Sequence, residues 1–152
     1  MAEQRTRFVG THEHGLDDKG RMVLPAKIRA QLGETGMIAM ADECLGLWTI
    51  EGFDAIADRV AAAVEARETE PAVLRKFMAY ACEVTPDQQG RVVIPQVLRD
   101  YAGLASEVVV NGRRDRAEIW AKERWEALVT PDTARPTEDG ADVGDTFAAL
   151  RF

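Results

Sequence analysis

The pattern of hydrophobic and polar positions runs through the same order twice along the 152-residue chain. In each half it predicts a strand, a polar turn, a second strand, a short helix, two more strands and a further helix. The strands expected in the first half cover 8–9 continued by 11–16, then 21–24, 37–41 and 45–50, and its short helix covers 27–32. In the second half we expect a strand ending at Val84, strands over 91–94, 108–110 and 117–121, a short helix over 96–101 and a last helix beginning at Trp125.

Glycine and proline mark the limits of these elements. Gly20 ends the polar turn over 17–20, where a positive φ costs glycine little. Pro25 suits the first turn of a helix, because its missing N–H is not needed there, and Gly33 ends that helix. Between the two halves, apolar residues at three- and four-residue spacing predict helices over 53–66 and 72–81.

The two halves share a sequence motif as well as an order of elements. Residues 13–25 (EHGLDDKGRMVLP) and 83–95 (EVTPDQQGRVVIP) align without a gap. The aligned identities are Glu13/Glu83, Asp17/Asp87, Gly20/Gly90, Arg21/Arg91, Val23/Val93 and Pro25/Pro95, followed by Arg29/Arg99 and Gly33/Gly103. A duplicated unit that keeps an acid and an arginine in one turn is more typical of a repeated binding element than of an active site. Neither half buries both faces of four short strands alone, so we expect one closed, pseudo-twofold β unit whose open ends are covered by helices.

The repeated Asp-x-x-x-Arg turn is the main candidate for binding chemistry. Arginine offers a planar fork that holds a guanine edge or a phosphate through two hydrogen bonds. An aspartate four residues earlier accepts from that guanidinium and fixes its rotamer, and Lys19 adds a phosphate contact. The second copy has Gln88-Gln89 in place of Asp18-Lys19 and is less basic. The alternative is that both pairs are exposed ion pairs that only brace the turns.

The charge balance changes this picture only in part. A net charge of −7 and a pI near 4.9 argue against a general nucleic-acid binder. The charge is unevenly spread, because the segment from Pro131 onward contributes −3 of it. The first repeat, in contrast, places Lys19, Arg21, Lys27 and Arg29 within eleven residues.

Other polar and aromatic residues have simpler interpretations. His12 and His14 lack a third metal ligand nearby, and no nucleophile accompanies the carboxylate pairs, so we expect no metal, no cofactor and no enzyme. Trp48 and Trp120 occupy equivalent strand positions and are expected in the core or in subunit contacts. Arg113, Arg114 and Arg116 are expected to form a solvated hairpin tip, with a second phosphate contact as the alternative. The remaining expectations are reduced and largely buried thiols at Cys44 and Cys82, and a cytoplasmic protein without a membrane span or secretory signal.

These strings resemble the MraZ family of bacterial transcriptional regulators, which are built from two tandem AbrB-like (SpoVT-AbrB, swapped-hairpin) units. The resemblance rests on 10–12, on 16–29 (LDDKGRMVLPAKIR), and on 87–95 (DQQGRVVIP), and it covers roughly 7–130. It implies an α+β fold in which two swapped-hairpin units form a pseudo-twofold β-barrel core with flanking helices. It also implies a ring-shaped homo-oligomer associated with the nucleoid, binding double-stranded DNA at short G-rich promoter direct repeats of a division and cell-wall gene cluster that includes its own gene.

Carried over by position, the resemblance assigns the DNA-reading turn to Asp17, Lys19 and Arg21 and its second copy to Asp87 and Arg91. Lys27 and Arg29 join the DNA-binding candidates because of the local positive charge of the first repeat, while Arg29 and Arg99 are equally compatible with phosphate contact and with bracing the short helix. The expected domains are an extension over 1–6, a first AbrB-like domain over 7–53, connecting helices over 54–81, a second AbrB-like domain over 82–130 and an acidic, flexible tail over 131–152. The rival hypothesis is an oligomeric protein-interaction module, such as an antitoxin-like partner binder that uses this tail. No membrane or small-molecule partner is expected.

Overall fold

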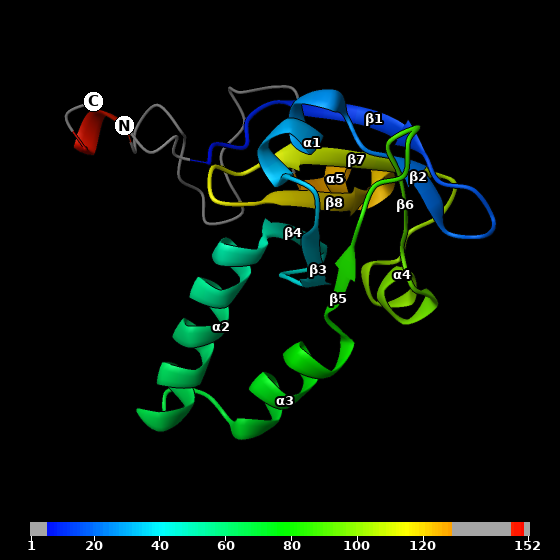
Figure 1. Cartoon of the computed structure of the whole chain (residues 1–152). Coiled ribbons are helices and arrows are strands. Elements are labelled where there is room, and N and C mark those ends of the chain that lie inside the picture. The colour runs from blue at the N-terminus through cyan, green and yellow to red at the C-terminus, as the bar shows by residue number, and fades with distance from the viewer. Residues whose placement is uncertain (1–5, 129–146, 151–152) are drawn as a thin grey trace. The chain divides into compact units, whose positions relative to one another are not determined.

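The computed structural model describes residues 6–128 and 147–150 and divides the chain into two compact units, one ending at Ala121 and one beginning at Lys122 (Figure 1). The first unit contains strands β1 (Thr11–Gly15), β2 (Arg21–Val23), β3 (Gly36–Met40), β4 (Leu45–Thr49), β5 (Cys82–Val84), β6 (Arg91–Val93), β7 (Glu107–Gly112) and β8 (Ala117–Ala121). Its helices are α1 (Ala26–Leu32), α2 (Ile50–Glu65), α3 (Pro71–Tyr80) and α4 (Gln96–Ala102). The second unit begins with α5 (Lys122–Leu128). The expected tail over 131–152 lies mostly outside the described residues.

The short helices begin and end where proline and glycine predict. Pro25 precedes α1 with φ −54° and Pro95 precedes α4 with φ −57°, which are ordinary values for the rigid proline ring. Gly33 and Gly103 end the two helices at φ +83° and +65°, a region of the backbone map that favours glycine. The α1 and α4 predictions are therefore confirmed within one residue at each limit.

Helices α2 and α5 begin earlier than the hydrophobic stripe indicates. Thr49 accepts a hydrogen bond from Gly52 N at 3.0 Å through its side-chain oxygen, so it caps α2 and the helix starts at Ile50 rather than Phe53. In the second unit, α5 starts at Lys122, three residues before the predicted Trp125. Apolar periodicity identifies both helices, and in α2 the capping contact of Thr49 fixes the first turn.

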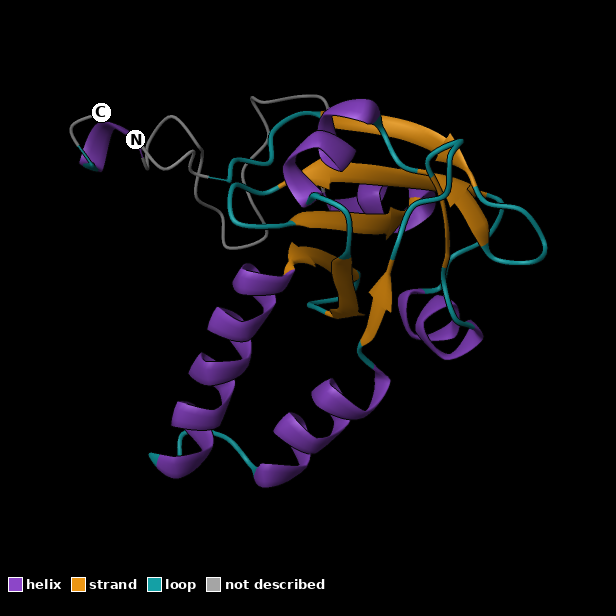
Figure 2. Cartoon of the chain, viewed as in Figure 1, coloured by secondary structure: helices purple, strands orange, loops and turns teal. Residues whose placement is uncertain are grey.

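The sheet is symmetric under exchange of the two halves. Six strands pair antiparallel in the order β1-β7-β8-β4-β3-β5, so β4 and its repeat equivalent β8 form the centre (Figure 2). The first strand of each half pairs with the third strand of the other half, β1 with β7 and β5 with β3. The two repeats therefore form one sheet.

The remaining two strands form a ribbon of their own. β2 and β6 pair antiparallel, with Met22 opposite Val92. These two side chains are buried, whereas Arg21, Val23, Arg91 and Val93 are exposed. The alternation of a strand therefore turns both motif arginines to the outer face of the ribbon.

The expected α+β class is confirmed, and the halves do combine into one β unit. Closure into a barrel is not seen in the strand pairing of the described residues. β1 and β5 are the two edge strands of the six-stranded sheet, and they do not pair with each other. Among the described strands, β2 and β6 pair with each other and with no strand of that sheet, so the ribbon is a separate sheet. The swapped-hairpin arrangement stays a prediction.

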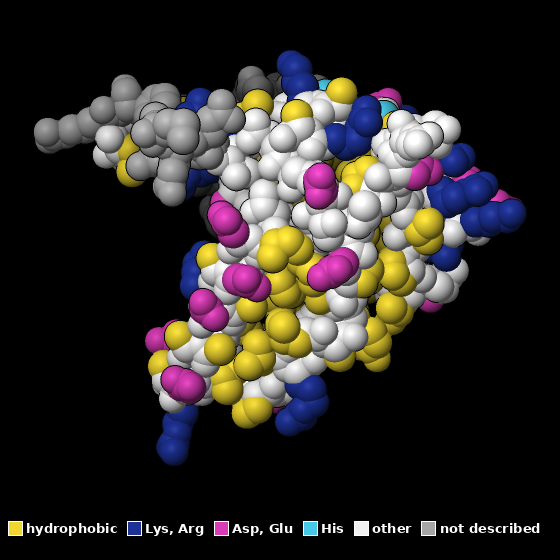
Figure 3. Space-filling model, viewed as in Figure 1, with side chains coloured by type: hydrophobic (Ala, Val, Ile, Leu, Met, Phe, Trp, Pro, Cys, Tyr) yellow, Lys and Arg dark blue, Asp and Glu magenta, His cyan; other side chains and the backbone are white. Residues whose placement is uncertain are grey.

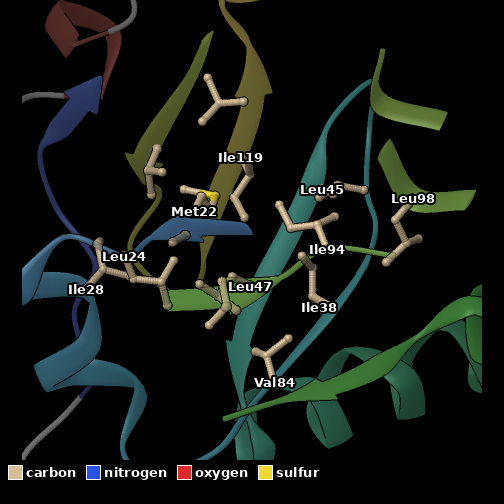
Figure 4. Close-up of a cluster of buried hydrophobic side chains, with 14 of the residues drawn as sticks. Met22, Leu24, Ile28, Ile38, Leu45, Leu47, Val84, Ile94, Leu98 and Ile119 are labelled. Atoms are coloured by element: carbon tan, nitrogen blue, oxygen red, sulfur yellow. The ribbon is translucent and has the colours of Figure 1, made fainter. Parts of the chain in front are cut away.

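The core receives side chains from both halves (Figure 4). Leu24 and Ile28 of the first repeat and Ile94 and Leu98 of the second are all at most 1% exposed. A second cluster lies at the α2–α3 hairpin, where the Phe53 ring stacks on Phe77 with centroids 5.3 Å apart. The predicted burial of both strand tryptophans is confirmed, at 2% exposure for Trp48 and 8% for Trp120. No helix in the described parts of the chain is long and apolar enough to cross a membrane.

Candidate functional site

The first Asp-x-x-x-Arg turn is organised around one carboxylate. Asp17 Oδ1 accepts from the main-chain N–H groups of Lys19 and Arg21, both at 2.9 Å. Asp17 Oδ2 accepts from Arg21 Nε at 2.7 Å. The main chain closes the same turn, because Gly20 N donates to Asp17 O and Asp17 N to Arg21 O, each at 3.0 Å. One aspartate thus fixes both the shape of the turn and the direction of the guanidinium.

The second turn repeats this geometry closely. Asp87 Oδ1 accepts from Gln89 N and Arg91 N at 2.9 Å, and Asp87 Oδ2 accepts from Arg91 Nε at 2.9 Å. One difference is that Arg91 also donates a terminal nitrogen to Gln89 Oε1 at 3.4 Å. Lys19 occupies the position of Gln89 in the first turn, and its ammonium group cannot accept a hydrogen bond from Arg21. The two arginines are therefore oriented alike, but Arg91 has one additional partner within its own turn.

Both carboxyl groups have a lowered pKa. For Asp17, the main cause is the hydrogen bond from the main-chain N–H of Arg21, followed by the bond from the Arg21 side chain. For Asp87, the main-chain N–H of Arg91 is likewise the largest cause. Hydrogen bonds to the charged form favour it, so both groups are ionised at neutral pH and accept from the arginines as carboxylates.

The ribbon brings the two arginines to one outer face. In its register Arg21 lies opposite Val93 and Val23 lies opposite Arg91. Arg21 and Arg91 are therefore diagonal neighbours, a relationship that places them about 7–8 Å apart in an antiparallel pair. Their side chains are 42% and 44% exposed. Both also line one open hollow of about 340 Å³, together with Asp17.

Basic side chains gather near the first turn. In the space-filling view, Lys and Arg side chains cluster at the end of the molecule where the loop between β1 and β2 projects (Figures 1 and 3). Lys19 in this loop and Lys27 on α1 are exposed. The predicted set Asp17, Lys19 and Arg21 thus shares one turn, with Arg91 close by across the ribbon.

The helix arginines lie elsewhere. Arg29 Nε donates to Leu24 O at 3.2 Å and its guanidinium packs on Gly90, in the second turn. Arg99 Nε donates to Ile94 O at 2.9 Å and packs on Gly20, in the first turn. From the sequence, Arg29 was a DNA-binding candidate and Arg99 was not, although both were compatible with phosphate contact and with bracing the short helix; their position against the turn of the other repeat was not predicted. Arg29 and Arg99 occupy the same position in the two repeats, and this equivalence was the sequence signal that both belong to the site.

A buried polar cluster was also missed. Arg116 donates to Glu118 Oε2 at 3.1 Å and lies over the Trp48 ring, 5.6 Å from its centroid. Glu118 is 7% exposed and also accepts from Trp120 Nε1 at 3.2 Å. The expectation of a solvated tip is wrong for Arg116, because strand alternation turns it to the same side as these partners, whereas Arg113 and Arg114 are exposed.

Histidine and cysteine form no metal centre in the part of the chain that the structure describes, where no three potential ligands gather. His12 and His14 lie on one side of β1, and burial, followed by the charge of His12, lowers the pKa of His14. Cys44 is buried as predicted, and Cys82 is half-buried. Burial raises the pKa of both thiols.

The fold and the two turns define a duplicated α+β protein in which each sequence repeat contributes one arginine, held by an aspartate, to a shared ribbon. The sequence matches the family model described as "MraZ protein, putative antitoxin-like" twice, over residues 7–76 and 77–144. The chain belongs to the MraZ family.

Individual relatives agree with this assignment. A protein of Bifidobacterium longum (strain NCC 2705) is 41% identical over 146 residues, which cover 95% of each chain. One of Salinispora arenicola (strain CNS-205) is 42% identical over 90% of this chain and 94% of its own. One of Clostridium botulinum (strain Eklund 17B / Type B) is 38% identical over 78% and 84%, respectively. All three are named transcriptional regulator MraZ.

Proposed function

We propose that this protein is a sequence-specific DNA-binding transcriptional regulator that reads the major groove with the β2–β6 ribbon. The observation that carries the proposal is the pair of carboxylate-braced arginines, Arg21 and Arg91, on the outer face of that ribbon. The names of the relatives support a role in transcription. They do not indicate an enzymatic activity.

The dimensions of the ribbon suit this role. The major groove of B-DNA is about 12 Å wide and admits a two-stranded β-ribbon. Asp17 holds Nε of Arg21, so the two terminal nitrogens remain to donate to O6 and N7 of a guanine. Val23 and Val93 are exposed between the arginines and provide apolar contact, which suits a thymine methyl group. This arrangement supports the reading of G-rich DNA that the family resemblance implies.

Phosphate contacts provide the rest of the affinity. Lys19 in the first turn and Lys27 on α1 are exposed, and we assign them to the DNA backbone. Arg29 was predicted to share this role; its guanidinium packs on the second turn, where a positioning role is the alternative to a phosphate contact. Locally basic residues compensate for the acidic chain, and binding is expected to weaken steeply with salt because condensed counterions are released.

The family resemblance extends the proposal to targets and assembly. It supports short direct repeats at the promoter of a division and cell-wall gene cluster, a nucleoid location and a ring-shaped homo-oligomer built on swapped-hairpin units. In a ring, several modest contacts act together, and avidity exceeds the affinity of one subunit by roughly 10²–10⁴. Repeats about one helical turn apart, roughly 34 Å, meet successive subunits on one side of the duplex.

The test is a titration of the full chain with its own upstream DNA and with scrambled DNA, at low and moderate salt. We expect preference for the native sequence and a steep loss of affinity with salt. Arg21→Ala is expected to abolish the preference while the fold, checked by circular dichroism, is retained. Arg113→Ala is the matched control, because Arg113 is an exposed arginine at the β7–β8 hairpin. Native preference in Arg21→Ala would contradict the site assignment.

The family description also supports a second candidate function, binding of a protein partner in the manner of an antitoxin. The acidic segment over 131–152, which lies mostly outside the described residues, would then contact that partner. A stoichiometric partner that co-purifies with the full chain but not with a chain ending at residue 130 would favour this function. Absence of DNA preference at either salt concentration would do the same.

A further inference from the structure

We propose that the helix arginines act crosswise as positioning residues, so that Arg99 of the second repeat orients the first DNA-reading turn and Arg29 of the first repeat orients the second. This inference rests on the proposed function for its effect on DNA. The crossed arrangement itself is a property of the free protein and is tested without DNA.

The first turn is held by residues of the second repeat. Gly20 has φ +81°, and a Cβ added there would lie 2.7 Å from Ile94 O and 2.8 Å from Arg99 Nε. Ile94 N also donates to Gly20 O at 2.8 Å. The Arg99 guanidinium therefore packs directly on the glycine that precedes Arg21. Arg99 and Asp17 also line one hollow of about 290 Å³.

The second turn is held by residues of the first repeat in the same way. Gly90 has φ +79°, and a Cβ added there would lie 2.6 Å from the central guanidinium carbon of Arg29. Leu24 N donates to Gly90 O at 2.9 Å, and Arg29 Nε donates to Leu24 O at 3.2 Å. The two halves thus exchange equivalent contacts across the ribbon.

The geometry favours a positioning role over a phosphate contact. Arg29 and Arg99 are half-buried, and each uses Nε on the carbonyl that follows its own ribbon strand. Their guanidinium groups fill the space that a side chain at Gly20 or Gly90 would otherwise occupy. Lysine retains the positive charge but lacks the planar guanidinium and its Nε–H donor. A substitution to lysine therefore removes the packing on the turn and keeps the charge that a phosphate contact needs.

The first experiment compares Arg99→Lys with Arg29→Lys in the full chain, using hydrogen exchange measured by mass spectrometry on peptides spanning the two turns. The amides of Lys19 and Arg21 report the first turn, and those of Gln89 and Arg91 report the second, because each donates to the aspartate of its turn. We expect Arg99→Lys to accelerate exchange in the first turn by roughly tenfold and to leave the second turn within about twofold. Arg29→Lys is expected to do the reverse.

The second experiment measures affinity for the upstream DNA as a function of salt. Arg99→Lys is expected to bind roughly tenfold more weakly with an unchanged salt slope, whereas a phosphate contact predicts near-normal binding by Arg99→Lys and a slope reduced by about one in Arg99→Ala. The loss should be non-additive with Arg21→Ala and additive with Arg91→Ala.

The outcomes separate the two proposals. Acceleration in the same repeat as the substitution, equal acceleration in both turns, or no acceleration would each overturn the crosswise arrangement. Crossed acceleration in a protein whose wild type shows no DNA preference would overturn the proposed function but leave this arrangement standing. Crossed acceleration together with the matched losses of affinity would establish both.

Discussion

Asp17 contacts Arg21 twice, through the main-chain N–H at 2.9 Å and through Nε at 2.7 Å, and Asp87 contacts Arg91 in the same two ways. A single carboxylate therefore shapes each turn and aims its guanidinium. The main-chain contact is the larger cause of the lowered pKa in both aspartates. Removal of an arginine side chain thus leaves most of the turn in place.

The first prediction concerns the titration of these two aspartates. We expect both to titrate below about 3.9, the ordinary aspartate value, when the carboxyl carbons are followed by NMR. Arg21→Ala should raise the pKa of Asp17 only part of the way, since the main-chain donors remain, and should leave Asp87 unchanged. Because the pKa is depressed in the folded state, the stabilising effect is present above the unfolded value and is lost as pH falls through the folded value. A complete return of Asp17 to the ordinary pKa would contradict this cause.

The second prediction separates orientation from charge at Asp17. Asp17→Asn keeps an acceptor for the main-chain N–H groups but loses the charged acceptor of Arg21 Nε, so we expect promoter affinity to fall by roughly tenfold. Asp18→Asn is the matched control, because it removes a neighbouring exposed carboxylate. Simple repulsion predicts that both variants bind DNA more tightly. Tighter binding by Asp17→Asn in an electrophoretic or anisotropy assay would therefore contradict the orienting role.

The third prediction uses the difference between Lys19 and Gln89. Lys19→Gln is expected to weaken binding to native and scrambled DNA about equally and to reduce the salt slope by about one, as expected for loss of one phosphate contact. Gln89→Lys removes the 3.4 Å acceptor of Arg91 and adds a charge, so it should strengthen binding. Fluorescence anisotropy at several salt concentrations measures both effects. A Lys19→Gln variant that changes base preference instead would assign Lys19 to the bases.

The fourth prediction concerns the glycine of the first turn. Gly20 and Gly33 have nearly the same positive φ, +81° and +83°. A Cβ at Gly33 meets nothing within 4 Å, so Gly33→Ala is expected to cost about 1–3 kcal/mol from backbone strain alone. Gly20→Ala should cost clearly more, because the Ile94 carbonyl and Arg99 must also move. Urea unfolding of both variants measures the difference, and equal losses would mean that the close contact carries no energy.

Sequence reasoning found the parts of this protein that depend on local chemistry. The first polar turn and the limits of α1 follow from Gly20, Pro25 and Gly33, whose conformational limits act within a few residues. The partners across the molecule do not follow from local patterns. β1 pairs with β7 of the other repeat, because the two halves share one sheet. Arg99 likewise packs on Gly20, in the turn of the other repeat.

The same limit explains the missed polar cluster. Arg116 follows two arginines in a hairpin, and local composition indicates solvent. Only the register of β8 on β4, with Glu118 opposite Gly46, gives Glu118 and Arg116 a buried position beside Trp48. A glycine opposite a carboxylate is a weak signal by itself. The contacts of Arg116 with Glu118 and Trp48 can be predicted only when the pairing of β8 with β4 is known.

The fifth prediction tests what this buried pair contributes to stability. The Arg116 and Glu118 side chains are only 14% and 9% exposed, and Arg116 Nε is buried without a hydrogen-bond partner. Glu118→Ala is expected to destabilise the fold by about 3–5 kcal/mol, because it leaves a buried guanidinium uncompensated. The exposed pair Arg113–Asp115, at 3.8 Å, is the control, and Asp115→Asn should cost at most about 1 kcal/mol.

A double variant shows whether the charge or the contact matters. Arg116→Met combined with Glu118→Gln removes both charges and keeps an acceptor for Trp120 Nε1, so we expect it to be more stable than Glu118→Ala by roughly 2 kcal/mol or more in urea unfolding. Recovery of this size would mean that the attraction between the two buried charges only offsets the cost of burying them, so that the pair contributes little net stability. If the double variant were as unstable as Glu118→Ala, the ion pair itself would hold β8 against β4, and its loss would also loosen the centre of the sheet that joins the two repeats.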